Sequence, residues 1–216
     1  MKNINRREFI KQAGIVSGSL ILFPAAASCS SISSVFDNSE IVRVRPSGWN
    51  PVVYNKNRGN AGAIPKSYLD DINGPDGETK HIGKHLPYIP EIDPSIIPKG
   101  FVPIMWGNPE KGYFPHPNSG TDGSSNSGGH WYNRIRIRKS SRWCAPTSET
   151  VFNGWPEIKS GDSGSYAVFN RGEITDKKGI KTIYMAKLPP DVSLGDTLRI
   201  QADCLQHGQY IDFLTL

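Results

Sequence analysis

Residues 197–204 alternate between polar and apolar side chains, and this stretch constrains the fold more tightly than any other. A period of two with one apolar face is typical of a β-strand that packs one side against the protein interior. Cys204 continues the apolar face, so we expect its sulfur to point inward. His207 follows three positions later and Gly208 permits a sharp turn, so the thiol and the imidazole can reach one metal ion. A buried structural cysteine beside an unrelated histidine, or half of a disulfide, is an equal alternative at this point.

Further strand-like runs fill the chain from residue 81 onward. They are short, rich in β-branched and aromatic residues and separated by Gly, Pro and Asn, and none shows a sustained helical period. This spacing predicts an all-β fold, an antiparallel β-sandwich, and residues 81–216 are enough to bury a core. The expected strands are Phe101–Trp106, Trp131–Arg138, Tyr166–Phe169, Lys181–Lys187, Asp196–Asp203 and Tyr210–Leu216.

We expect residues 1–28 to be an export signal. Arg6-Arg7-Glu8-Phe9-Ile10-Lys11 resembles the twin-arginine pattern R-R-x-F-L/I-K, and an apolar run too short to span a bilayer follows it. The residues before Cys29 resemble a lipobox, which predicts a lipid on Cys29 and a chain anchored to a membrane in the periplasm or cell envelope. Ordinary cleavage at the Ala/Ser cluster, with Cys29 incidental, is the alternative. Residues 29–40 are rich in Ser and Asn and predict a flexible tether.

The net charge argues against nucleic-acid binding. The whole chain has 25 basic and 20 acidic residues, but four of the basic residues and one of the acidic ones fall within residues 1–28. Without that segment 21 basic and 19 acidic residues remain, a net charge of +2. Proteins that bind nucleic acid through its phosphates usually carry a strong positive charge, so we expect no nucleic-acid partner.

Two other segments have a composition of their own. Residues 41–80 are dense in Gly, Pro, Asn and Asp; after a short strand at Ile41–Arg45 we expect an irregular extension laid on the main domain. Pro115–Gly129 is a Gly- and Ser-rich loop flanked by His116 and His130. A loop of this length in a compact domain is usually functional or disordered.

Arginines recur at every second position of one expected strand, at Arg134, Arg136 and Arg138. They share one strand face, which could attract an anion. We favour the simpler interpretation of a solvated face whose charges discourage edge-to-edge pairing.

Four of the five histidines lie in three short motifs that follow one another along the chain. They are Lys84-His85-Leu86-Pro87, His116-Pro117 with His130-Trp131-Tyr132, and Gly195-Asp196-Thr197-Leu198 leading to Cys204-Leu205-Gln206-His207-Gly208. In this order they resemble the K-H-V-P, H-P-M-x-x-x-H-Y and closing C-N-x-H-G segments of the superoxide reductases, the neelaredoxin and desulfoferrodoxin group. The resemblance covers roughly residues 81–216.

The resemblance implies an immunoglobulin-like β-sandwich that holds one mononuclear iron, Fe2+ or Fe3+. Its activity would be the reduction of superoxide to hydrogen peroxide with one electron and two protons, and Lys84 matches the lysine that attracts the anion. Imidazoles suit ferrous iron, and an anionic thiolate opposite an open position pushes electron density toward a bound oxygen species. By matching position, the ligands would be four histidines and an axial cysteine: His85, His116, His130, His207 and Cys204.

Several features depart from the family pattern. Gly83 stands where the family often has a Glu that closes the open position in the oxidised state, so the spectrum of that state should differ. Thirteen residues separate His116 from His130, more than in the family, so His116 is the least secure ligand. His81, four positions before His85, is a substitute candidate, although we favour the simpler interpretation of a surface histidine. The four-cysteine rubredoxin-like module is absent, so an external electron donor, rubredoxin-like or other, is required. The sequence leaves open whether the chain forms a homo-oligomer.

Three other functions stay open. A blue-copper electron carrier also uses Cys and His on a β-sandwich, although no Met follows His207. Gly161–Ser165 is similar to the G-D-S-G-G around a serine-protease nucleophile, but His130 lacks the usual surroundings of the base, so we expect a turn there. The third is a non-catalytic exported sandwich with a disulfide between Cys144 and Cys204.

Overall fold

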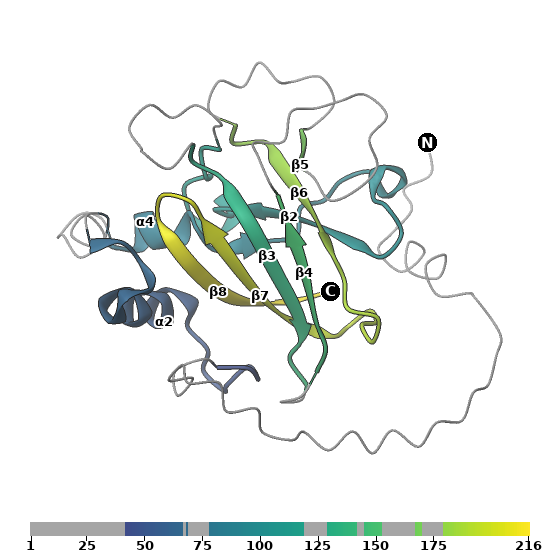
Figure 1. Cartoon of the computed structure of the whole chain (residues 1–216), viewed down its shortest axis with the longest axis horizontal. Helices are drawn as coiled ribbons and strands as arrows, with labels where there is room; N and C mark the ends of the chain where they lie inside the picture. The colour runs from purple at the N-terminus through teal and green to yellow at the C-terminus, as the bar shows by residue number, and fades with distance from the viewer. Residues whose placement is uncertain are drawn as a thin grey trace. The chain divides into compact units, whose positions relative to one another are not determined.

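Two four-stranded antiparallel sheets pack face to face, so the prediction of an all-β sandwich is confirmed (Figure 1). The computed structural model describes residues 42–66, 68, 78–118, 129–141, 145–152, 167–169 and 179–216. One sheet has the order β1-β2-β6-β5, formed by β1 (Pro87–Tyr88), β2 (Phe101–Trp106), β6 (Thr182–Lys187) and β5 (Ala167–Phe169). The other has the order β4-β3-β7-β8, formed by β4 (Thr147–Val151), β3 (Tyr132–Lys139), β7 (Thr197–Cys204) and β8 (Gly208–Thr215). The immunoglobulin-like arrangement stays a prediction.

The core lies between the two sheets. Apolar residues at alternate positions of β2 and β6 pack against those of β3 and β7. Cys204, the last residue of β7, belongs to the same buried cluster. Cys204 is 4 % exposed, so the alternation along residues 197–204 predicted the orientation of its side chain correctly.

Six predicted strands are present within one or two residues of the expected bounds, and the errors have physical causes. β4 was missed because its sequence TSETV is polar and mostly exposed, as suits an edge strand. β1 was also missed, because it has only two residues and begins with a proline. The strand expected at Ile41–Arg45 is wrong for the described part, residues 42–45, where the N–H of Arg45 donates to the Ser140 hydroxyl instead of joining a ladder.

The N-terminal extension is more regular than expected. It contains the α-helix α2 (Pro51–Arg58) and the π-helical segment η1 (Gly59–Ala63), and the helix α4 (Glu78–Gly83) follows. Asn50 caps α2 by accepting a hydrogen bond from the Val53 N–H, and Pro51 occupies the first turn, where its missing N–H costs nothing. Two short 3-10 helices, η2 (Pro94–Ile96) and η3 (Pro109–Lys111), lie farther along the chain. None of the helices in the described ranges is long and apolar enough to span a membrane.

The extension packs against β8, the edge strand of its sheet, and Figure 1 shows α2 and α4 on that side. The Asn55 amide donates to the Ile211 carbonyl at 2.7 Å and accepts from the Ile211 N–H at 2.8 Å. The side chain therefore satisfies the open edge as a neighbouring strand would. Trp49 packs edge-on against Phe213 at 4.8 Å between ring centroids. Residues 43–216 consequently form one compact unit.

The three alternating arginines of β3 do not form a uniformly solvated face. Arg136 pairs with Glu149 on β4 at 2.5 Å, and Arg134 lies 3.7 Å from Asp203 on β7. Arg138 is only 6 % exposed, which corrects our expectation for that residue. The paired arginines serve strand pairing, and we assign them no anion site.

Candidate metal centre

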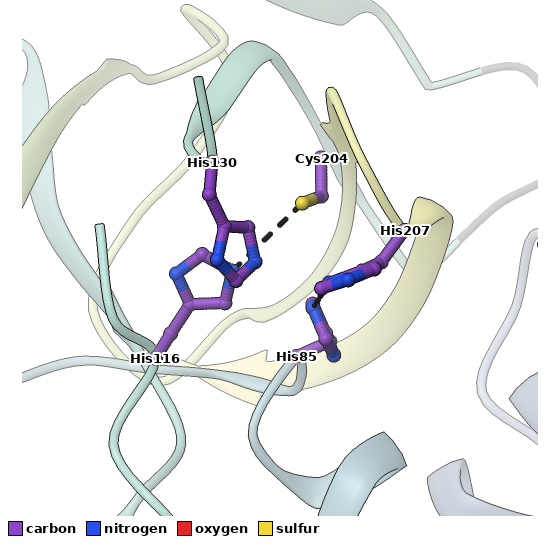
Figure 2. Close-up of side chains that lie close together, drawn as sticks. All are labelled: His85, His116, His130, Cys204 and His207. Atoms are coloured by element: carbon purple, nitrogen blue, oxygen red, sulfur yellow. Dashed lines mark hydrogen bonds between the residues drawn. The ribbon is translucent and has the colours of Figure 1, made fainter. Parts of the chain in front are cut away.

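Five side chains from separate parts of the chain converge at one end of the sandwich, and Figure 2 shows them pointing toward one another. Each contributes one nitrogen or sulfur atom, and these atoms all lie within 4.8 Å of one another. Four of the five are buried and His207 is half-buried. The five residues are those that the motifs single out: His85, His116, His130, Cys204 and His207.

The β7–β8 hairpin brings Cys204 and His207 together. Cys204 pairs with Gly208 across the two strands, which leaves His207 in the tight turn between them. Gly208 has a φ of 80°, a left-handed conformation that favours glycine. A Cβ on Gly208 would also overlap the carbonyl oxygen of Ala63, so the turn fits closely against the extension.

His85 lies in the turn after α4, and its hydrogen bond fixes its tautomer. Its Nδ1 is 3.0 Å from the carbonyl oxygen of His81, which can only accept, so Nδ1 carries the proton. The Nε2 lone pair is then directed at the cluster, 2.9 Å from Nδ1 of His207. His81 itself lies outside the cluster and contributes through its backbone, so it does not replace His116.

His116 is held by Asn118, a residue that the sequence analysis missed. The Asn118 amide donates to the carbonyls of His116 at 3.1 Å and Gly179 at 3.0 Å, so its Oδ1 faces the imidazole. That oxygen accepts from the Tyr184 hydroxyl at 2.7 Å and from His116 Nδ1 at 3.1 Å. His116 therefore presents its unprotonated Nε2 to the cluster, 3.8 Å from the Cys204 sulfur. The amide is fully satisfied and 4 % exposed, so the orientation is rigid.

Burial keeps two histidines of the cluster, His85 and His116, neutral. Desolvation, followed by the neighbouring histidines and Lys84, lowers the pKa of His85 well below its usual value. Desolvation and His130 do the same to the pKa of His116, while the bond to Asn118 opposes the shift. A neutral imidazole has the free lone pair that a metal requires.

The Cys204 thiol is also kept neutral in the metal-free chain. Burial raises its pKa to about 12, although the backbone N–H groups of His207 and Gln206 and the charge of Lys84 act in the opposite direction. A bound cation reverses this balance, because coordination deprotonates a thiol outright and the same N–H groups then hydrogen-bond to the thiolate.

The donor set fits a metal ion. Metal–nitrogen bonds are about 2.0–2.1 Å long, so two nitrogens bound at right angles lie about 3 Å apart, close to the 2.9 Å between His85 and His207. Four imidazoles and one thiol, largely shielded from water, match a transition metal better than Ca2+ or Mg2+, which prefer oxygen. The cluster could hold a metal ion.

The space beside Gly83 is filled by an aromatic ring. A Cβ added to Gly83 would overlap the ring of Tyr113, so no larger side chain fits there without moving that ring. Position 83 therefore supplies no ligand, and the Tyr113 ring covers the backbone where the resembled family carries a Glu. Lys84 follows, half-buried, with Nζ 5.4 Å from the ring centroid of Tyr68.

Cys204 carries a free thiol in this structure, as the metal-site interpretation requires. Cys144, its proposed disulfide partner, lies outside the described residues, as do the export signal, Cys29 with the tether, and the Gly161–Ser165 segment.

Comparison of the chain with protein-family models, with curated proteins and with solved structures finds no match.

Proposed function

We propose that this chain is an exported single-iron protein that reduces superoxide to hydrogen peroxide. The observation that carries the proposal is the convergence of four imidazoles and one thiol on one point. The three motifs that resemble the superoxide reductases supply all five side chains of this cluster, although they are far apart in sequence.

Each residue of the cluster would have a role in binding the iron. His85, His116, His130 and His207 would hold the iron as neutral ligands, and Cys204 would bind as a thiolate. Iron bound to this set supplies a one-electron couple, whose potential the thiolate and its hydrogen bonds adjust. Because the cluster is buried, the electrostatic effect of each neighbouring group is stronger than it would be in water.

Lys84 has the place and the charge to attract a small anion. Its charge contributes to the lowered pKa of both His85 and His116 and acts on Cys204, so its field reaches the cluster. Reduction of one superoxide consumes one electron and two protons and releases one hydrogen peroxide. The electron comes from an external one-electron donor protein and the protons from solvent.

Export would place this activity in the periplasm or cell envelope. We propose twin-arginine export followed by lipid attachment at Cys29, on the basis of the sequence pattern alone. That route carries proteins that fold before export, which suits a metal inserted in the cytoplasm.

The main competing function is electron transfer by a copper ion. A blue-copper centre uses one cysteine and two histidines with a weak axial ligand. Here four histidines surround the thiol, and no methionine follows His207. The donor set therefore favours iron.

Elemental analysis of the chain purified from iron-replete cells tests the proposal first. We expect about one iron per chain, lost in Cys204→Ala, since the thiolate ligand is removed. Rapid mixing of the reduced protein with superoxide should then oxidise the iron and release hydrogen peroxide.

Each contrary outcome points elsewhere. Copper in place of iron would support the electron carrier, and iron that does not react with superoxide would rule out the enzyme. Absence of metal together with a mapped Cys144–Cys204 disulfide would leave a structural domain.

A further inference from the structure

One wall of the metal centre comes from the N-terminal extension, for which the sequence suggests no role. Tyr68 is 6 % exposed, and its ring is stacked on His207, with 3.7 Å between centroids and 19° between planes. It also meets the ring of His85 edge-on at 5.5 Å. The ring therefore contacts two members of the cluster.

Tyr68 is itself held firmly. Its hydroxyl lies 3.3 Å from Nδ1 and 3.4 Å from the carbonyl oxygen of His81, and it packs in a buried group with Ile64, Ile82 and Tyr210. A ring fixed at both ends can fix the plane of the imidazole stacked on it. His207 needs this support because it lies in a hairpin turn and is the only half-buried member of the cluster.

The same ring holds the cation of the site. Lys84 Nζ lies over Tyr68, 5.4 Å from the ring centroid, which is within the range of a cation–π interaction. The flexible lysine side chain is thereby kept beside the cluster.

The extension is anchored next to this point. Arg58 donates to the backbone carbonyl of Gln209 at 3.2 Å and to its side-chain oxygen. Asn55 bonds to both backbone groups of Ile211, and Ala63 lies against Gly208. The segment 55–63, which precedes Tyr68, therefore contacts the hairpin that carries Cys204 and His207.

We propose that Tyr68 is a positioning residue of the metal centre: it orients His207 for metal binding and keeps Lys84 beside the cluster, where it attracts a small anion. The extension is then a part of the centre and not an appendage. This rests on metal binding by the cluster, but not on the identity of the metal or on a reaction with superoxide.

Cobalt binding by the full chain tests the proposal with Co2+ alone as the probe. Co2+ gives visible bands that report its coordination geometry and a charge-transfer band that reports the thiolate. We expect Tyr68→Leu to weaken Co2+ affinity about 10-fold, the lower end of the loss seen for groups that orient ligands, and to shift the visible bands. Tyr68→Phe keeps the ring and should retain the affinity. Val53→Ala is the control, since Val53 lies in the same extension with an exposed side chain.

Azide, a small anion, tests the second half of the proposal. Its affinity for the Co2+-loaded protein should fall in Tyr68→Leu and in Lys84→Met by a similar factor, because both changes remove the ammonium from the same place. Unchanged Co2+ affinity and bands in a folded Tyr68→Leu would overturn the proposal, as would unchanged azide affinity.

A measurement without any variant covers the case in which Tyr68→Leu does not fold. Co2+ added to the unaltered chain should slow hydrogen exchange at the Tyr68 amide, which donates to the Pro65 carbonyl at 3.0 Å. No change there, in a chain that binds Co2+, would also overturn it. A chain that binds neither Co2+ nor iron would instead remove the metal centre on which the proposed function depends.

Discussion

His116 and His207 face the same cluster, but the protein holds them by different means. His116 is fixed by hydrogen bonds, since Asn118 satisfies its Nδ1 and is satisfied in turn by Tyr184 and two carbonyls. His207 is held largely by shape, through the stacked ring of Tyr68 and the tight turn at Gly208, and its Nδ1 contacts another member of the cluster, Nε2 of His85, at 2.9 Å.

The difference matters because the two devices specify different things. A hydrogen bond to Nδ1 determines which nitrogen of the imidazole carries the proton, whereas a stacked ring determines only the plane of the imidazole. The His116 side should therefore be sensitive to the loss of single polar atoms. The His207 side should be sensitive to changes of volume and backbone geometry.

Asn118→Leu should give the largest effect and break the His116 side alone. It leaves the Tyr184 hydroxyl and Nδ1 of His116 without the acceptor that Asn118 provides, and it removes the amide donor from two carbonyls. Each unsatisfied buried group costs about 1–3 kcal/mol, so we expect a loss of about 3–4 kcal/mol in the free energy of unfolding, measured by denaturant titration. Metal affinity should fall about 10–100-fold.

Asn108→Ala is the control for that variant. Asn108 caps η3 at the surface by accepting from the Glu110 N–H, and its loss should cost about 1 kcal/mol without changing metal affinity. Equal metal affinities in the Asn118 and Asn108 variants would contradict the role given to Asn118.

Gly208→Ala should break the His207 side. The substitution places a side chain at a φ of 80° and against the Ala63 carbonyl. Strain of this kind costs about 1–3 kcal/mol, and we expect the extension to be displaced as well. Limited proteolysis between α2 and α4 should become faster than in Gly195→Ala, a control glycine that also has a positive φ but has open space around it. Equal cleavage rates would show that the turn does not depend on the extension.

The same contrast explains what the sequence could and could not predict. Cys204 was placed correctly because the alternation of its own strand determines the side that it faces. Asn118 was missed because its role depends on Gly179, which lies 61 positions later and whose carbonyl it bonds. A Cβ at Gly179 would overlap the Asn118 carbonyl, a constraint visible only once the two segments are adjacent.

Tyr68 was missed for a different reason. It follows a stretch rich in Gly, Asn and Pro in which no period shows one face of an element. The Asn50-Pro51 pair was a readable sign that a helix begins, because an amide cap followed by proline suits the first turn. Nothing in the sequence of that helix, however, indicates that a residue after it, Tyr68, packs against His207 in the β7–β8 hairpin.

Two buried tyrosines near His116 test the role of its hydrogen bonds through a smaller effect on stability. The Tyr184 hydroxyl donates to Asn118 and accepts from the Tyr132 N–H at 3.2 Å. The Tyr132 hydroxyl is buried and has no hydrogen-bond partner among the described residues. Tyr184→Phe should therefore cost about 1–3 kcal/mol, while Tyr132→Phe should be neutral or slightly stabilising, as measured by thermal unfolding. Equal losses in the two variants would mean that the hydroxyl network contributes nothing to stability.

Asp212→Asn should give the smallest effect, at the point where Trp49 anchors the extension to β8. Asp212 accepts from the Trp49 indole N–H at 2.8 Å and from the Phe213 N–H at 2.7 Å, yet burial raises its pKa despite these bonds and the charges of Lys111 and Arg45. Because the folded pKa lies above the unfolded one, ionisation of this carboxyl opposes folding at pH 7. The penalty shrinks as the pH falls through the folded pKa and is gone below the unfolded pKa. An asparagine oxygen accepts both bonds without a charge. The variant should thus unfold at a higher temperature than the wild type at pH 7 and lose that advantage in acid. A higher unfolding temperature that persists in acid would mean that the carboxylate charge does not cause the difference.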